Sequence, residues 1–404
     1  MRVLVLDGNE NQAVATVRSL GRAGHQVEVA AHTPWSKAGL SRFAKKRVQY
    51  PAPQESKSAF IACMLEYCAR APGTLLLPMT ERTTLPLSES REQIELAGGK
   101  VILAPHETIL RAFDKNETTK LAEQLGIAVP RTRQADSRAN AHEVAAALTY
   151  PLVLKPTSSE SIGADGKVKA TGAPVYAREA GELDAAIEDV FSRSPSALLQ
   201  EFVPGGGGGY FALMNQGELR AEFAHRRIRD VRPTGSGSAV RESAHPDPRM
   251  RDAGLKILHA LKWHGVAMVE FRVRPDGSPV FLEVNGRFWN SLPLAVYSGV
   301  DFPKLLVDIA ERGDCDNVLQ YRAGVRCRWI LGDARHLIEV LRGPPAGFPG
   351  PFPERLPTVL EFFRPVPGTF HDNFTIDDPL PEVGDWADFL ARKLPGGLDR
   401  WTKR

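Results

Sequence analysis

The sequence is poor in cysteine and contains no long apolar run. Its four cysteines, Cys63, Cys68, Cys315 and Cys327, lack the short paired spacing of a zinc site, so we expect buried or incidental thiols. No segment approaches the roughly 20 consecutive apolar residues that a membrane span needs. The apolar run before Asp7 is too brief for the core of a signal peptide. These absences predict a cytoplasmic protein without a membrane partner.

A strong excess of one charge sign is also missing. The 404 residues carry a formal net charge of +3, which gives no reason to propose nucleic acid or a membrane surface as a partner. Hydrophobic residues make up 43% and charged residues 25%, as in ordinary globular proteins. The length is sufficient for two or three domains.

A dinucleotide-binding fingerprint is absent from the N-terminal part. Arg2–Leu6 is expected to form a strand, Ala13–Ala23 a helix and Gln26–Ala30 a second strand, which together open a βαβ unit of a parallel sheet. The turn DGNENQ has a single glycine in place of G-x-G-x-x-G, and the second strand does not end in Asp or Glu. This pattern argues against a nicotinamide oxidoreductase.

The α/β alternation continues with expected strands at Thr74–Met79 and Lys100–Ala104 and a helix near Arg82–Leu96. Thr80 and Glu81 follow the first of these strands, at the edge where open α/β sheets bind ligands. Polar residues commonly line such loops, so a structural role for both is the more frequent explanation.

Residues 266–291, VAMVEFRVRPDGSPVFLEVNGRFWNS, predict a hairpin that assembles a cation site. Two runs rich in β-branched and apolar residues flank Pro275–Ser278, whose PDGS sequence is a strong hairpin turn. A turn centred within PDGS places Glu270 directly opposite Glu283. Two carboxylates would then face each other across the strand pair.

Like charges at such positions destabilise the strand pair unless something cancels them. Mg²⁺ takes carboxylate and amide oxygens and completes its shell with phosphates, and Asn285 is expected on the same face as Glu283 and Phe281. Arg287 could then hold an anion beside the metal. A solvated hairpin face, with Arg272 as partner of the carboxylates, explains the hairpin alone equally well.

Two lysines precede the hairpin. Ile109–Leu125 is predicted to be one helix with Lys115 in its middle, whereas PLVLKP is predicted to be a strand that ends at Lys155, which the following proline forces out of the ladder. The small-residue loop Thr157–Lys167 could form a flap over phosphates, although surface loops of this composition are common.

A strand at Ala197–Val203 is followed by Pro204 and the glycines Gly205–Gly209, a run that cannot hold a fixed conformation cheaply. Tyr210–Met214 is expected to pair with Leu219–Ile228.

In the second of these strands, His225, Arg227 and Arg229 share one face, which is either a solvated rim or an anion clamp. The loop Thr234–Ser238 favours the clamp, because glycine and serine turns can present backbone N–H groups to anions.

From about Arg322 the composition changes, and residues 344–367 are rich in proline. Phe348, Phe352, Phe362 and Phe363 are interleaved there, which predicts an ordered segment packed on the main body. The sequence assigns this segment no chemistry.

Taken together, Lys115, Lys155 with its loop, the QEFV strand, the basic strand and the E…ExNxR hairpin resemble the ATP-grasp superfamily of ATP-dependent ligases. The carboxylate–amine or thiol ligases and the carbamoyl-phosphate-synthetase-like members are the types it suggests. The resemblance covers about residues 1–312, and LEVNGR with the upstream VEF is its specific motif. It implies an α/β fold with α+β ATP lobes. The expected domains are a Rossmann-like domain at 1–112, a small lobe and hinge at 113–200, a large lobe with the Mg-ATP site at 201–321 and an extension at 322–404.

The resemblance also implies residue roles. Glu270, Glu283 and Asn285 match the metal ligands, for Mg²⁺ or Mn²⁺, and Arg287 and Arg227 match groups that steady the transferred phosphoryl group. The implied ATP contacts are Lys115, Lys155, Ser161, Gly163, Gln200, Glu201, Phe202 and Val203. The implied substrate contacts are Arg229, Ser236, Gly237, Asn290 and Ser291.

Two features depart from the family pattern. The loop after Lys155 has Ser158, Ser159 and Glu160 where many members are richer in glycine, and no acidic residue follows the QEFV strand to hold the ribose, because Gly205–Gly209 occupies that region.

The implied function is an ADP-forming ligase that activates a small carboxylic acid as an acyl phosphate and joins it to an amine. The alternatives are a bicarbonate-using enzyme of the carboxylase or carbamoyl-phosphate type and a non-catalytic ATP-binding regulatory protein. A homodimer is compatible with the family.

Overall fold

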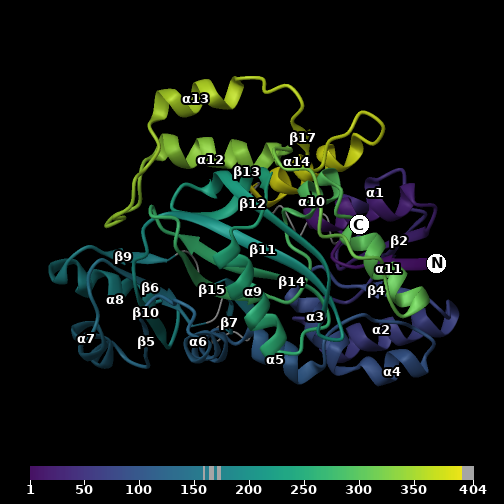
Figure 1. Ribbon diagram of the computed structural model, residues 1–404, viewed down its shortest axis with the longest axis horizontal. Helices are drawn as coiled ribbons and strands as arrows, with labels where there is room; N and C mark the ends of the chain where they lie inside the picture. Colours follow the sequence, from purple (N-terminus) through teal and green to yellow (C-terminus); the bar gives the residue numbers. More distant parts are fainter. Residues whose placement is uncertain (158–159, 163–167, 171–173, 394–404) are drawn as a thin grey trace.

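The computed structural model describes residues 1–157, 160–162, 168–170 and 174–393, which contain a parallel sheet, a four-stranded antiparallel sheet and a larger, mostly antiparallel sheet (Figure 1). The α/β class expected from the sequence is confirmed by this architecture. The boundaries of the four expected domains stay predictions.

The N-terminal sheet has the strand order β3-β2-β1-β4, and all of its pairings are parallel. Its strands are β1 (Arg2–Val5), β2 (Gln26–Ala31), β3 (Lys46–Gln49) and β4 (Leu75–Leu77). The helices of this part are α1 (Asn11–Arg22), α2 (Lys57–Arg70), α3 (Glu81–Glu89), α4 (Arg91–Leu96) and α5 (His106–Phe113). The expected strand at Lys100–Ala104 is wrong, because it contributes only an isolated bridge from Lys100 to Leu75.

A second, antiparallel sheet has the order β5-β10-β6-β9. It is built from β5 (Thr132–Ala135), β6 (Leu152–Pro156), β9 (Val175–Ala177) and β10 (Ala197–Glu201), with helices α6 (Lys115–Gln124), α7 (Arg138–Ala146) and α8 (Leu183–Phe191) beside it. The short hairpin of β7 (Glu160–Ile162) and β8 (Val168–Ala170) forms a separate pair. We call residues 132–202 the small lobe; most of its buried hydrophobic side chains form a core of their own.

The largest sheet has seven strands in the order β15-β14-β11-β12-β13-β16-β17. These are β11 (Gly206–Asn215), β12 (Glu218–Arg232), β13 (Ser236–Ala244), β14 (Gly265–Val273), β15 (Pro279–Asn285), β16 (Arg326–Arg328) and β17 (Phe370–His371). Its helices are α9 (Pro248–Ala260), α10 (Leu292–Ser298), α11 (Phe302–Arg312), α12 (Ile330–Arg342), α13 (Arg355–Phe363) and α14 (Leu380–Lys393). Buried side chains of the large sheet belong to two hydrophobic clusters. Each cluster also includes residues of the N-terminal sheet, so the large sheet and the N-terminal sheet share both cores.

The glycine run is ordered, contrary to the sequence-based expectation. Gly206–Gly209 form the start of β11 and pair with β14, and Gly208 and Gly209 also pair with β12. Neighbouring groups fill the space of their missing side chains: a Cβ on Gly207 would lie 2.4 Å from Arg227 Nη1, and one on Gly209 would lie 2.8 Å from the Phe211 ring. Glycine is therefore required here by close packing.

Two further expectations are corrected. Residues 109–125 form two helices, because the Asp114 side chain accepts hydrogen bonds from the backbone N–H groups of Asn116 and Glu117 and so starts α6 anew. Pro156 remains in the ladder of β6, opposite Ala197.

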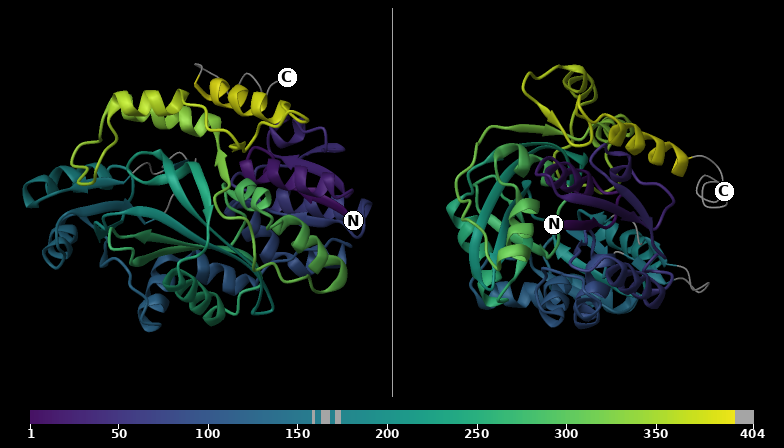
Figure 2. Two further views of the ribbon diagram at one scale, coloured as in Figure 1. Left: turned by 45° about the horizontal axis from the view of Figure 1, so that its top comes forward. Right: turned by 90° about the vertical axis from the view of Figure 1, so that its right-hand side faces the viewer.

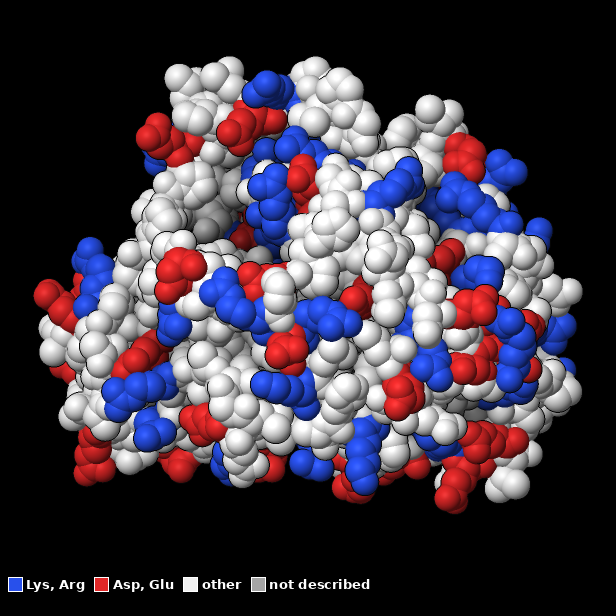
Figure 3. Space-filling model, in the orientation of Figure 1, with Lys and Arg blue, Asp and Glu red and all other residues white. Residues whose placement is uncertain are grey.

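Acidic and basic side chains are interspersed over the face shown in Figure 3, in keeping with the small net charge. Among the residues that the structure describes, no helix combines the length and the apolar character needed to cross a bilayer.

Candidate functional site

The two carboxylates of the β14–β15 hairpin face each other. Glu270 pairs with Glu283 in the register, as the sequence predicted, but the next pair is Phe271 with Phe281, so Leu282 forms a bulge. The bulge reverses the alternation: Phe281 is fully buried against Phe271 instead of sharing the face of Glu283.

Two cations neutralise these carboxylates. Lys115 Nζ lies 3.0 Å from Glu283 Oε2, and Arg227 Nη2 lies 2.7 Å from Glu270 Oε1. The expectation that Arg272 takes this role is wrong, because its Nε donates to the carbonyl of Val203 at 3.3 Å. Burial raises the pKa of Glu283, but Lys115, the hydrogen bond from Asn285 and the charge of Arg287 together outweigh burial and hold that pKa well below its ordinary value. Glu283 is therefore ionised at neutral pH.

The predicted amide ligand and arginine continue the same row. Asn285 Nδ2 donates to Glu283 Oε1 at 3.0 Å, and Arg287 Nη2 donates to Asn285 Oδ1 at 3.0 Å. A line of alternating donors and acceptors thus runs from Lys115 to Arg287.

Lys115 is the first residue of α6, a position that follows from the cap formed by Asp114. Its side chain is half exposed, and Glu283 raises its pKa. An anion beside Lys115 would also lie near the positive end of the helix dipole.

Lys155 approaches from the small lobe. Its Nζ donates to Gln200 Oε1 at 2.7 Å, and Gln200 Nε2 donates in turn to Thr132 Oγ1 at 2.9 Å. Burial, followed by the nearby positive charge of Lys115, lowers the pKa of Lys155 to about 8. A cation in such surroundings gains from an anionic ligand.

Residues 200–203, the QEFV segment, lie on the same side of the site as Lys155. The backbone N–H of Glu201 donates to the carbonyl of Arg131 at 2.9 Å, and its carboxylate accepts a bond from the N–H of Thr149 at 2.8 Å. The Phe202 ring packs against Tyr176 with centroids 6.4 Å apart.

Three adjoining cavities connect these groups. The central cavity is lined by Lys115, Lys155, Gln200, Glu270 and Glu283. The β10 cavity shares Lys155, Gln200 and Leu282 with it and continues past Glu201, Phe202 and Val203 to Tyr176, Thr234 and Arg272. The N-terminal cavity shares Lys115, Asn116, Thr157 and Leu198 with the central cavity and is also lined by Glu10, Thr80, Glu81, Arg82, Arg287 and Asn290.

Some predicted substrate residues lie elsewhere. Arg229 donates hydrogen bonds to both carboxylate oxygens of Asp333 on α12. β-bulges on either side of Arg229 displace it from the row of His225 and Arg227. Ser291 Oγ lies 2.8 Å from His225 Nε2 in a buried contact. None of Arg229, Ser291 and Gly237 lines the three cavities.

The loop Thr234–Ser238 is also displaced from its expected place. Thr234 and Gly235 line the β10 cavity, whereas Arg287 and Asn290 line the N-terminal one. The side chains of Ser236 and Ser161 are not described, and Gly163 lies outside the described residues.

Several site residues were not foreseen. Asp7 accepts bonds from Thr83 Oγ1 at 2.6 Å and the N–H of Thr80 at 2.9 Å, and so fixes the wall of the N-terminal cavity. Asp230 lies 3.6 Å from Arg227, and burial raises its pKa to about 6. Arg272 was foreseen only as a partner of the carboxylates, and the β-bulge that leads Leu282 into the cavities had no signal in the sequence.

The donor set fits a hard divalent cation. Glu270, Glu283 and Asn285 offer carboxylate and amide oxygens within one hairpin, the ligands that Mg²⁺ prefers in proteins. Among the described residues, no three His, Cys, Asp or Glu side chains cluster as a metal site requires, so the amide of Asn285 would complete this set.

Comparison with known proteins places this site in context. No family model matches the chain. It is 29% identical over 223 residues to D-alanine–D-alanine ligase of Gloeobacter violaceus, which covers 50% of this chain and 69% of that protein. It is 30% identical over 208 residues to the vancomycin/teicoplanin A-type resistance protein VanA of Enterococcus faecium, covering 47% and 57%. It is 28% identical over 244 residues to the carbamoyl phosphate synthase large chain of Deinococcus radiodurans, covering 57% of this chain and only 22% of the relative.

Solved structures show the same fold. L-amino acid ligase from Bacillus licheniformis aligns with a TM-score of 0.58 at 18% identity, over 77% of this chain and 74% of that one. The biotin carboxylase domain dimer of Hydrogenobacter thermophilus 2-oxoglutarate carboxylase, solved with MgADP, ADP and bicarbonate, aligns with a TM-score of 0.61 at 14% identity, over 80% and 73%. The hairpin with its facing carboxylates, the three adjoining cavities and these likenesses agree, and they support the resemblance to the ATP-grasp superfamily.

Proposed function

We propose that this protein is an ADP-forming ligase that activates a small carboxylic acid as an acyl phosphate and joins it to an amine. The observation that carries the proposal is the central cavity, where Lys115, Lys155, Glu270 and Glu283 meet. In the proposal the base of ATP occupies the β10 cavity and the acid occupies the N-terminal cavity, beside Arg287.

Glu270, Glu283 and Asn285 would hold Mg²⁺, which supplies positive charge at the phosphate oxygens when bound. Their present partners, Lys115 and Arg227, are then free to turn toward the triphosphate. The carboxylates thus keep two cations in place before the nucleotide arrives, which reduces the cost of assembling the site.

The chemistry needs a strongly cationic site, because a carboxylate and a triphosphate repel each other. A carboxylate oxygen attacks the γ-phosphorus, the bond to the β–γ bridging oxygen breaks, and ADP leaves. The amine then attacks the acyl carbon, loses a proton, and displaces phosphate. Arg287 and Arg227 would steady the transferred phosphoryl group by position and charge.

Isotope transfer tests this proposal. Pooled carboxylic acids labelled with ¹⁸O in the carboxylate are incubated with pooled amines and MgATP, and the released phosphate is analysed by mass spectrometry. One ¹⁸O atom is expected in the phosphate, with an amide product in the pool. Acid-dependent ADP release that yields unlabelled phosphate would contradict it.

A bicarbonate-using reaction is the second candidate, favoured by the similarity to carbamoyl phosphate synthase and to the biotin carboxylase domain. ADP release that depends on bicarbonate and needs no organic acid would select it. ATP binding without phosphate release on any acid or amine would indicate a regulatory protein. Because the reaction consumes ATP, the proposal places it in the cytoplasm.

A further inference from the structure

The segment 343–354, which joins α12 to α13, crosses from the large sheet to the small lobe. Figures 1 and 2 both show this yellow-green segment beside β9 and α8. The Phe348 ring lies 5.1 Å from Tyr176 and 6.1 Å from Phe202, measured between centroids, and both pairs have the edge-to-face geometry that aromatic rings favour.

The backbone approaches the small lobe so closely that glycine is needed on each side of Phe348. Gly347 has φ +70°, and a Cβ there would lie 2.6 Å from the Tyr176 carbonyl oxygen. A Cβ on Gly350 would lie 2.7 Å from the Phe348 ring and 3.3 Å from that of Phe202. The segment around Phe348 is therefore closely packed against the small lobe.

Tyr176 and Phe202 are also lining residues of the β10 cavity. Among the described residues, neither side chain belongs to any of the three hydrophobic core clusters. Phe348 supports both rings from outside the cavity, and Phe352, 6.4 Å from Phe348, extends the same cluster.

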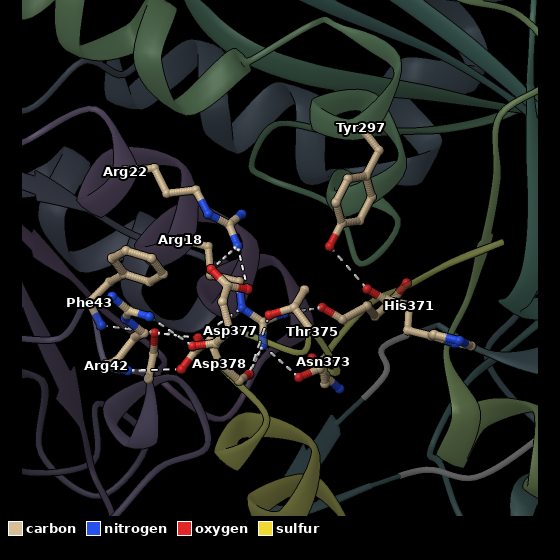
Figure 4. Close-up of polar contacts among 12 residues, drawn as sticks. Arg18, Arg22, Arg42, Phe43, Tyr297, His371, Asn373, Thr375, Asp377 and Asp378 are labelled. Atoms are coloured by element: carbon tan, nitrogen blue, oxygen red, sulfur yellow. Dashed lines mark hydrogen bonds and ion pairs between the residues drawn. The ribbon is translucent and has the colours of Figure 1, made fainter. Parts of the chain in front are cut away.

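The two ends of the segment are anchored on the body. On α12, Asp333 accepts bonds from Arg229 of β12. Beyond α13, the chain is held on the N-terminal domain by Arg18, which donates to Asp378 Oδ2 at 2.9 Å and to backbone carbonyls (Figure 4). The segment therefore spans from an anchored extension to the small lobe.

We propose that the segment 343–352 completes the wall of the β10 cavity, with Phe348 as a positioning residue that holds Phe202 and Tyr176 against the base of a purine nucleoside triphosphate. The proposal rests on the proposed function only in taking that ligand to be a nucleotide. It gives the C-terminal extension a role in nucleotide binding.

Phe348→Ala tests this, with Phe363→Ala as the control, because Phe363 is 73% exposed on α13. Two probes are titrated in the presence of Mg²⁺: a non-hydrolysable ATP analogue and inorganic tripolyphosphate, which lacks the base. Phe348→Ala is expected to weaken the ATP analogue about tenfold and to leave tripolyphosphate unchanged. Phe348→Leu should recover part of the loss, and Phe363→Ala should bind both probes as the wild type does.

In turnover assays the KM for ATP should rise in Phe348→Ala while kcat is kept. Unchanged affinity for the ATP analogue would overturn the inference, as would an equal loss of both probes, which indicates general damage to the lobe. Wild-type protein that binds tripolyphosphate but no nucleotide would also overturn it. Failure of the ligase proposal looks different: nucleotide binding still depends on Phe348, but no acid promotes ADP release.

Discussion

The individual residue on which the site depends most is Glu283. It contacts Lys115 and Asn285 and faces Glu270, so it links the expected metal ligands to the expected phosphate contacts. Asn285 in turn links Glu283 to Arg287.

Glu283→Ala is expected to reduce ATP turnover by about 100-fold or more, the scale on which a transition-state contact acts. Its side chain is 28% exposed, so the loss of folding stability should be small. Steady-state ADP release measures the effect, and Glu117→Ala on α6 is the control, since Glu117 is half exposed and forms an ion pair with Lys120. Near-normal turnover at saturating Mg²⁺ would rule out this role.

Lys155 predicts a pH dependence of nucleotide binding. With a pKa of about 8, its ammonium is charged below pH 8 and loses its proton above it. Affinity for the ATP analogue should therefore fall between pH 7 and pH 9. A bound triphosphate raises the pKa, so binding at pH 8 should take up about half a proton.

Calorimetry in two buffers of different ionisation enthalpy measures this uptake. Lys155→Arg keeps its charge over the whole range and should show no uptake. An identical proton uptake by the variant would assign the dependence to another group.

At the residue scale the sequence was informative where a local pattern set the geometry. The turn PDGS and the alternation of the strand placed Glu270 opposite Glu283, as the register shows. The partners of these carboxylates come from distant strands and helices, so pairing with Arg227 and Lys115 instead of Arg272 could not be read from the hairpin.

At the scale of elements, β11 requires glycine for reasons of packing that its composition does not reveal. Gly206–Gly209 lie in a paired strand, and at Gly207, Gly208 and Gly209 nearby side chains occupy the space that a Cβ would need. Composition alone suggested a loose segment, since the packing that orders it involves residues far away in the sequence.

Gly207→Ala should reduce turnover with little change in stability. The new Cβ would displace the Arg227 guanidinium, which is 2.7 Å from Glu270, and a misplacement of about 1 Å can lower the rate roughly 100-fold. Gly206→Ala is the matched control, because a Cβ there meets nothing within 4 Å. Turnover and thermal unfolding of both variants provide the measurement, and equal turnover would contradict the account.

The division of residues 109–125 into α5 and α6 was also not predicted from the sequence. The sequence predicted one helical stretch through Asp114, but the hydrogen bonds that Asp114 accepts from Asn116 and Glu117 start a new helix, and this places Lys115 at a helix N-terminus.

At the scale of the whole molecule, the C-terminal extension joins parts that are far apart in the sequence. It adds β16 and β17 to the large sheet, contacts the N-terminal domain through Arg18 and Asp378, and reaches the small lobe through Phe348. The aromatic pattern predicted an ordered segment. Its destinations could not be predicted, because they depend on buried ion pairs that leave no local signal.

Arg18→Met should release this extension. The pair of Arg18 and Asp378 is buried, with 3% and 2% exposure, and removing one partner of a buried pair costs about 3–5 kcal/mol. Arg22→Met, which breaks an exposed pair with Asp377, should cost under about 1 kcal/mol. Urea unfolding and limited proteolysis near α14 measure both, and equal stability of the two variants would refute the anchoring role.

Binding of a non-hydrolysable ATP analogue, measured by calorimetry with and without Mg²⁺, tests the central claim most directly. The account predicts that wild-type protein binds the analogue much more tightly with Mg²⁺, and that Glu283→Ala and Asn285→Ala lose this gain while remaining folded. Mg²⁺-independent binding, or an undiminished gain in both variants, would contradict the assignment of this hairpin as the metal–nucleotide site.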